Sequence, residues 1–150
     1  MLQSLFGKTQ IPHYYGNSVR ELFIVVALLF LITAPFSEAL LPIGGVYSSY
    51  THVVIALLLV LLAGLTNPRS MVSLVLDFAA ALLGAFFLET AAISLYQSDS
   101  LAIFLAREAA AILFLFALYF SVKTLRAMIV GSIGGYRPVL SKRDEDHVRG

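Results

Sequence analysis

The chain has 150 residues, of which 59% are hydrophobic and only 13% are charged. Soluble domains are about 45–50% apolar and about 25% charged, so this composition argues against a soluble domain and predicts a protein embedded in lipid. A formal net charge of +1 without any basic, aromatic-rich stripe argues against nucleic-acid binding. The absence of cysteine excludes disulfide frameworks, thiolate metal sites and thiol redox chemistry.

The first residues, 1–17, are mixed in polarity and predict a cytoplasmic leader that lies near the membrane surface. Ser18 and Glu21 have the spacing of a capping box, which marks a helix start, and a long apolar run follows them. Pro35 lacks an N–H group and is expected to kink or end this helix. We therefore predict a first membrane segment at about 19–41.

An alternative remains open for this first segment. Arg20, the apolar run and the small residues around Glu38 also resemble a secretory signal peptide with its cleavage site. The following segment would begin on the outer, non-cytoplasmic side in either case, so the topology predicted for the rest of the chain is the same.

Two further apolar segments follow. Turn-forming residues at 42–45 separate the first segment from a second at about 46–65. Asn67 as an N-cap and Pro68 in the first turn predict the start of a third segment at about 68–96.

The fourth segment, predicted at about 100–130, forms a long apolar hairpin with the third. Ser98 or Asp99 in the short turn is expected to cap it. Each arm exceeds the roughly 20 residues that cross a hydrocarbon core. The charged residues 131–150 predict a cytoplasmic tail without fixed structure.

The distribution of Lys and Arg predicts the orientation. They occur in the leader, between the second and third segments, and at the end of the chain: Lys8, Arg20, Arg69, Lys123, Arg126, Arg137, Lys142, Arg143 and Arg149. By the positive-inside rule both termini are cytoplasmic. The predicted fold is an all-α integral membrane bundle of four transmembrane helices at 18–130, in the plasma or inner membrane of a prokaryote.

Four ionisable residues lie inside the hairpin: Asp77, Glu89, Arg107 and Glu108. A charge in lipid is costly, so each must be paired, line water or lie near an interface. Counting from the turn, Glu89 is level with Glu108, and Arg107 is one residue nearer the outer face. At 1.5 Å per residue this predicts an outer-leaflet layer about 14 Å below the turn.

Two hypotheses explain this layer. The favoured one is structural: Arg107 pairs with Glu89 and holds two helices together, while Glu108 either extends toward the membrane surface or points at an oligomer partner. The other is functional, with two carboxylates that bind a cation or relay a proton. Adjacent residues differ by about 100° around a helix, so Arg107 and Glu108 face different neighbours. Glu38 and His52 are the available partners near the outer ends of the first two segments.

Asp77 is predicted to lie level with residues 120–121 of the fourth segment. The favoured hypothesis is a structural bridge to Lys123, supported by Ser73. The functional hypothesis is a protonatable site exposed to the cytoplasm. At 1.5 Å per residue Asp77 lies about 18 Å from Glu89, which is too far for a direct proton transfer.

Small residues recur at helical spacing on both arms of the hairpin and predict that the arms pack closely. They are Ser73, Asp77, Ala80, Gly84 and Ala91 on the first arm, and Ala102, Ala106, Ala110, Ala117 and Ser121 on the second.

No metalloprotease, phosphate-loop, serine-hydrolase or dinucleotide motif occurs, and neither a metal nor a cofactor is expected. The sequence therefore favours a small non-enzymatic membrane protein, a structural or accessory subunit that forms a homo-oligomer or binds other membrane proteins in the bilayer. The alternative is a small ion- or proton-coupled transporter or channel that uses Glu89, Arg107, Glu108 and Asp77.

Overall fold

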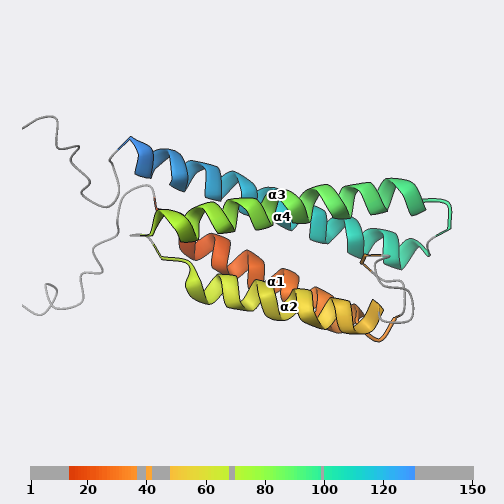
Figure 1. Cartoon of the computed structure of the whole chain (residues 1–150). Coiled ribbons are helices and arrows are strands. Elements are labelled where there is room, and N and C mark those ends of the chain that lie inside the picture. Colours follow the sequence, from red (N-terminus) through yellow and green to blue (C-terminus); the bar gives the residue numbers. More distant parts are fainter. Residues whose placement is uncertain (1–13, 37–39, 42–47, 68–69, 99, 131–150) are drawn as a thin grey trace, which may run out of the picture.

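The computed structural model describes residues 14–36, 40–41, 48–67, 70–98 and 100–130. These residues form four α-helices: α1 (Gly16–Thr33), α2 (Ser48–Leu65), α3 (Met71–Leu95) and α4 (Leu101–Ile129). The helices run up and down beside one another (Figure 1). At the hairpin end of the bundle, α1 is followed by α2 and α3 by α4; at the terminal end α1 begins and α4 ends.

Within the described residues, three helices are long and apolar enough to cross a membrane, namely α1, α3 and α4. The fourth, α2, is equally apolar but contributes the shorter stretch Tyr50–Leu65. Large hydrophobic side chains such as Leu57, Phe86 and Ile112 are exposed on the outside of the helices. A surface of this kind is suited to lipid rather than water. The predicted all-helical, membrane-embedded architecture is confirmed at this level.

The start of α1 differs from the prediction. The helix begins at Gly16 with Tyr15 as its N-cap, and no side chain caps it. The capping box expected at Ser18 and Glu21 is therefore wrong, because both residues already lie inside the helix. A tertiary contact ties the helix start down instead: the backbone N–H of Tyr15 donates to Thr124 Oγ1 on α4 at 3.2 Å.

The end of α1 follows from Pro35, as predicted, but comes earlier than residue 41. The last helical residue is Thr33. A turn closes the helix there, with the N–H of Phe36 donating to the carbonyl of Thr33 at 2.9 Å. Ala34 still has helical backbone angles, but Pro35 has no N–H to donate to the preceding turn, which accounts for an end at this point.

The caps of α3 and α4 are serines one to three residues beyond the predicted ones. Ser70 caps α3 by accepting from the N–H of Ser73, so Asn67 is not the N-cap. Ser100 caps α4 by accepting from the N–H of Ile103, whereas Ser98 bonds back to α3. Pro68 and Asp99 lie outside the described residues, as do the larger part of the predicted leader and all of the predicted tail.

The helices form a ring in which the extent of packing differs from one neighbouring pair to the next. The most extensive packing joins α3 to α4, and α1 packs well on both α2 and α4, whereas α2 and α3 touch little. The core inside this ring combines alanines with aromatic and branched aliphatic side chains, among them Phe23 and Val26 of α1, Leu88 of α3 and Ala117 of α4. The predicted hairpin is thus the most tightly packed part of the bundle.

Two contacts define how α3 and α4 are aligned. At the first, Arg107 Nη1 donates to the carbonyl of Ala91 at 3.4 Å. At the second, the Phe114 ring lies directly over Gly84. Seven residues separate the two contacts on each helix, the repeat of antiparallel coiled-coil packing. A further seven residues bring Asp77 level with Ser121, in agreement with the predicted depth.

The predicted seam of small residues is buried in part. Ser73, Asp77 and Ala91 of α3 and Ala110, Ala117 and Ser121 of α4 are buried, whereas Ala80, Gly84 and Ala106 are half-buried and Ala102 is exposed. The seam therefore lies along the heptad positions of the two helices.

Changing Gly84 to alanine is expected to destabilise the bundle by about 1–3 kcal/mol. The new Cβ would lie 2.6 Å from the Phe114 ring. That ring is buried beside Phe23, at 6.2 Å between centroids, and has little room to move. The clash outweighs the roughly 1 kcal/mol by which alanine favours a helix over glycine.

Equilibrium unfolding in detergent micelles measures this effect. Gly64→Ala on α2 is the matched control, because a Cβ there meets no atom within 4 Å. The control is expected to be neutral or stabilising. Equal stabilisation by both alanines would contradict the close approach of α3 and α4.

Candidate functional site

Arg107 lies fully buried at the hairpin end of the bundle, with 0% of its surface exposed. Its Nε donates to the carbonyl of Leu40 at 2.8 Å, and its Nη1 donates to the carbonyl of Ala91. One side chain of α4 thereby holds both α3 and the segment that connects α1 to α2. Hydrogen bonds from a charged donor are among the stronger ones in proteins.

His52 of α2 is also fully buried and binds the same connecting segment. Its Nε2 accepts from the N–H of Leu40 at 3.2 Å and from the N–H of Leu41 at 3.3 Å. An imidazole nitrogen that accepts carries no proton, so this ring is neutral with its proton on Nδ1. The ring also packs against Phe30 of α1, with 5.5 Å between centroids.

These two side chains bracket Leu40, because one binds its carbonyl and the other its N–H. Leu40 and Leu41 are both buried in consequence. Of the predicted outer cluster, the structure thus brings together His52 and Arg107, through a backbone segment rather than directly. Glu38 lies outside the described residues.

The two glutamates of the predicted layer do not join this bracket. Glu89 and Glu108 are half-buried, and neither makes a hydrogen bond or ion pair to another residue in the described ranges. The predicted ion pair between Glu89 and Arg107 is therefore wrong. Arg107 reaches α3 at Ala91, and residues 89 and 91 differ by about 200° around a helix.

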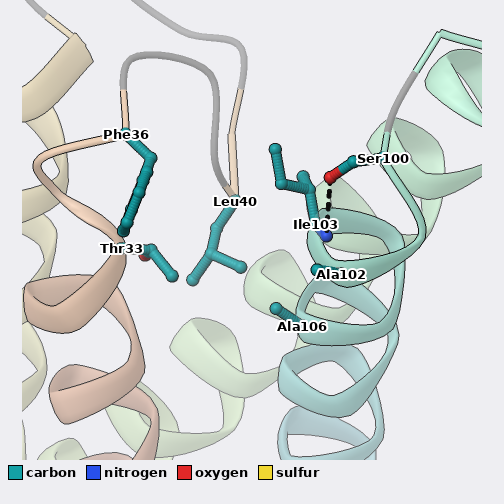
Figure 2. A pocket seen from close by; sticks show the side chains of 7 residues that line it. All are labelled: Thr33, Phe36, Leu40, Ser100, Ala102, Ile103 and Ala106. Carbon is teal, nitrogen blue, oxygen red and sulfur yellow. Dashed lines mark hydrogen bonds between the residues drawn. The ribbon is translucent and has the colours of Figure 1, made fainter.

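A cavity of about 270 Å³ lies between the end of α1 and the start of α4. Figure 2 shows its lining, which consists of Thr33, Phe36, Leu40, Ser100, Ala102, Ile103 and Ala106. Figure 2 marks one hydrogen bond among these residues: the Ser100 hydroxyl accepts from the N–H of Ile103 and so caps α4. None of these seven residues carries an ionisable side chain.

Asp77 lies near the terminal end and is 2% exposed. Its Oδ1 accepts from Thr66 Oγ1, at the end of α2, at 3.2 Å. Its Oδ2 is buried and has no hydrogen-bond partner in the described part of the chain, and the same holds for the hydroxyl of Ser121, which is 1% exposed. Two unsatisfied oxygens therefore lie at one level of the α3–α4 interface.

Lys123 does not reach Asp77. Its ammonium group lies over two aromatic rings, 4.6 Å from the centroid of Tyr15 and 5.2 Å from that of Tyr119, and its side chain is exposed. The predicted Asp77–Lys123 bridge is therefore wrong. Asp77 is level with Ser121, whereas Lys123 lies two residues, or about 3 Å, further along α4 and is turned about 200° from Ser121, the residue that faces α3.

Ser73 does not support Asp77 either. Its hydroxyl accepts from the N–H of Asn67 at 2.9 Å and donates to the carbonyl of the same residue at 3.4 Å. Ser73 thus ties the α2–α3 connection to the first turn of α3. The polar partner that Asp77 does have, Thr66, was not predicted from the sequence.

No group of three or more His, Cys, Asp or Glu residues in the described ranges is arranged to hold a metal ion. No protein-family model, curated protein or solved structure matches this chain.

Proposed function

We propose that the protein is a small non-enzymatic integral membrane protein, a structural or accessory subunit that assembles with its own copies or with other membrane proteins. The observation that carries this proposal is the use of Arg107. Its buried guanidinium donates hydrogen bonds to two backbone carbonyls, one in α3 and one in the α1–α2 connection, and so holds these two elements against α4. Polar groups between membrane helices commonly serve such a packing role.

In this proposal all four helices cross the bilayer and both termini are cytoplasmic, in the membrane of a prokaryote. The positive-inside distribution of Lys and Arg supports this orientation. The contacts of Lys123 with Tyr15 and Tyr119 support a membrane–water interface at the terminal end of the bundle, because tyrosine and lysine are typical of such interfaces.

Glu89 and Glu108 supply the argument for assembly. Both are half-buried at the level of the hydrocarbon, and neither has a partner in the described part of its own chain. An unpaired carboxylate in lipid is costly. A hydrogen-bond donor or cation on a neighbouring chain would remove this cost.

Native mass spectrometry of the protein in nanodiscs tests the assembly role. We expect a defined oligomer in the wild type, and Glu89→Gln and Glu108→Gln are each expected to weaken it about tenfold or more. That factor corresponds to about 1.4 kcal/mol, close to the net value of a hydrogen bond to a charged group. Glu21→Gln, an exposed carboxylate of α1, is the control and is expected to assemble like the wild type.

An oligomer unaffected by both substitutions would contradict the assembly role of Glu89 and Glu108. In that case the alternative function, an ion- or proton-coupled transporter or channel that uses the Glu89, Arg107 and Glu108 layer with Asp77, becomes the leading one. The observation in favour of this alternative is the buried Asp77 oxygen without a partner. Cation flux into proteoliposomes, compared between wild type and Asp77→Asn, tests it.

A further inference from the structure

We propose that Asp77 and Ser121 bind one monovalent alkali cation between α3 and α4, near the terminal end of the bundle. This inference goes beyond the proposed function and does not depend on it, because a subunit without transport activity can hold a structural ion.

The alignment of the two helices places the two side chains opposite each other. The contacts of Ala91 with Arg107 and of Gly84 with Phe114 set a seven-residue repeat that continues to Asp77 and Ser121. Both side chains are nine-tenths buried or more, on the helix faces that pack together.

Each of the two residues carries a buried oxygen that nothing in the described ranges satisfies, Asp77 Oδ2 and Ser121 Oγ. About nine in ten buried polar groups in proteins have a partner, and an orphaned group requires an explanation. Two of them at one level of one interface are explained together by a single bound group that contacts both.

Thr66 does not neutralise the carboxylate. Its hydroxyl has one proton and two acceptors within reach, the carbonyl of Leu62 at 3.0 Å and Asp77 Oδ1 at 3.2 Å. When the Thr66 hydroxyl donates to the Leu62 carbonyl, Asp77 Oδ1 has no donor in the described part of the chain either. The carboxylate therefore has at most one shared hydrogen bond.

No described cation balances Asp77. Lys123 lies over two tyrosine rings, and Arg20 and Arg126 are exposed. The Tyr14 hydroxyl interacts electrostatically with Asp77: its pKa is raised by burial, lowered by Arg20 and raised further by Asp77. Tyr14 thus remains a neutral hydroxyl, and none of the described side chains supplies the positive charge that an ionised Asp77 requires.

The chemistry of the site selects the class of ion. Its donors are oxygens, which suit hard cations rather than the metals bound by sulfur or imidazole. Ca²⁺ takes six to eight oxygen ligands and Mg²⁺ a regular octahedron, usually with several carboxylates or waters. One carboxylate with hydroxyl neighbours instead matches a single positive charge.

The melting temperature of the full-length protein in nanodiscs tests this proposal at about pH 8, where free carboxylates are ionised. NaCl and KCl are each titrated against choline chloride at constant ionic strength. We expect one alkali cation to raise the melting temperature saturably in the wild type, by about 3 °C or more at saturation. Equilibrium dialysis with radiolabelled sodium or potassium is expected to give one ion per chain.

Variants assign the effect to the two residues. Asp77→Asn is expected to abolish the cation-dependent rise, and Ser121→Ala to raise the half-saturating concentration about tenfold. Ser94→Ala, an exposed serine of α3, and Glu21→Gln are the matched controls and are expected to respond like the wild type. Because Asp77→Asn can also impair folding, its helix content is compared with that of the wild type by circular dichroism. If the helix content of Asp77→Asn is lower, the proposal is tested by the comparison of wild type with Ser121→Ala alone.

Three outcomes would overturn the proposal. The first is a wild-type melting temperature that is the same in alkali and choline salts, which would mean that a proton or water satisfies Asp77. The second is a cation effect that survives Asp77→Asn in a folded protein. The third is a Ser121→Ala variant with the same half-saturating concentration as Ser94→Ala.

Discussion

Replacing Arg107 with methionine is expected to lower the free energy of unfolding by about 3 kcal/mol. Methionine keeps much of the side-chain volume but cannot donate to the carbonyl of Leu40 or to that of Ala91. The Leu40 carbonyl then loses a charged donor at a place where that residue is 0% exposed. Denaturant unfolding in mixed micelles measures the change.

Arg126→Met is the matched control, because Arg126 lies on the same helix and is exposed. It is expected to change the free energy of unfolding by less than about 0.5 kcal/mol, as exposed substitutions do. Arg107→Lys is expected to fall between the two, since an ammonium group lacks the planar fork of guanidinium. If Arg107→Met were no worse than Arg126→Met, the geometry described for the hairpin end would be contradicted.

A second measurement separates the predicted cause from general destabilisation. The chain has no cysteine, so a single Leu41→Cys substitution reports only on that position. Leu41 is buried beside the Leu40 bracket, and its thiol is expected to react slowly with a water-soluble maleimide. Adding Arg107→Met is expected to speed the reaction about tenfold or more, whereas adding Arg126→Met leaves the rate unchanged.

The sequence predicted the helices and the levels of their residues along the bundle, because both depend on properties of long segments rather than on single contacts. Apolar composition gives the existence of a helix, and a rise of 1.5 Å per residue gives the level of each side chain. The level of Asp77 opposite residues 120–121 agrees with the structure for this reason. Helix ends depend on single hydrogen bonds, and the bond from Tyr15 N–H to Thr124 joins residues too far apart in sequence to be anticipated.

The side-chain partners were not predictable in the same way, because depth does not give direction around the helix axis. Glu89 and Lys123 have the predicted levels, yet Ala91 and Ser121 are the residues at the α3–α4 interface. The seven-residue spacing from Asp77 to Gly84 to Ala91 was the signal that could have shown this face.

The contacts of His52 and Arg107 with Leu40 could not be predicted from sequence patterns, for a different reason. Their partners are backbone groups of a connecting segment, and any residue type carries those groups. The sequence could mark His52 and Arg107 as polar residues that need partners. It could not show that both would bind the backbone of one leucine.

Replacing His52 with phenylalanine is expected to lower the free energy of unfolding by about 2–4 kcal/mol. Phenylalanine retains a ring beside Phe30 but has no acceptor, so the buried N–H groups of Leu40 and Leu41 lose the nitrogen that binds them. Tyr50→Phe is the control, because Tyr50 lies on the same helix and is exposed. A His52→Phe variant as stable as this control would show that the two N–H groups do not depend on His52.

Combining His52→Phe with Arg107→Met tests whether the two residues act on one segment. Once either substitution has released Leu40, the other residue has less to hold, so the double variant should lose less stability than the two single losses added together. Coupling between residues that share a partner is typically about 0.5–3 kcal/mol, whereas independent sites add to within about 0.5 kcal/mol. Additive losses would mean that His52 and Arg107 stabilise separate parts of the hairpin end, and a measured coupling would make Leu40 the point at which α2, α3 and α4 are held together.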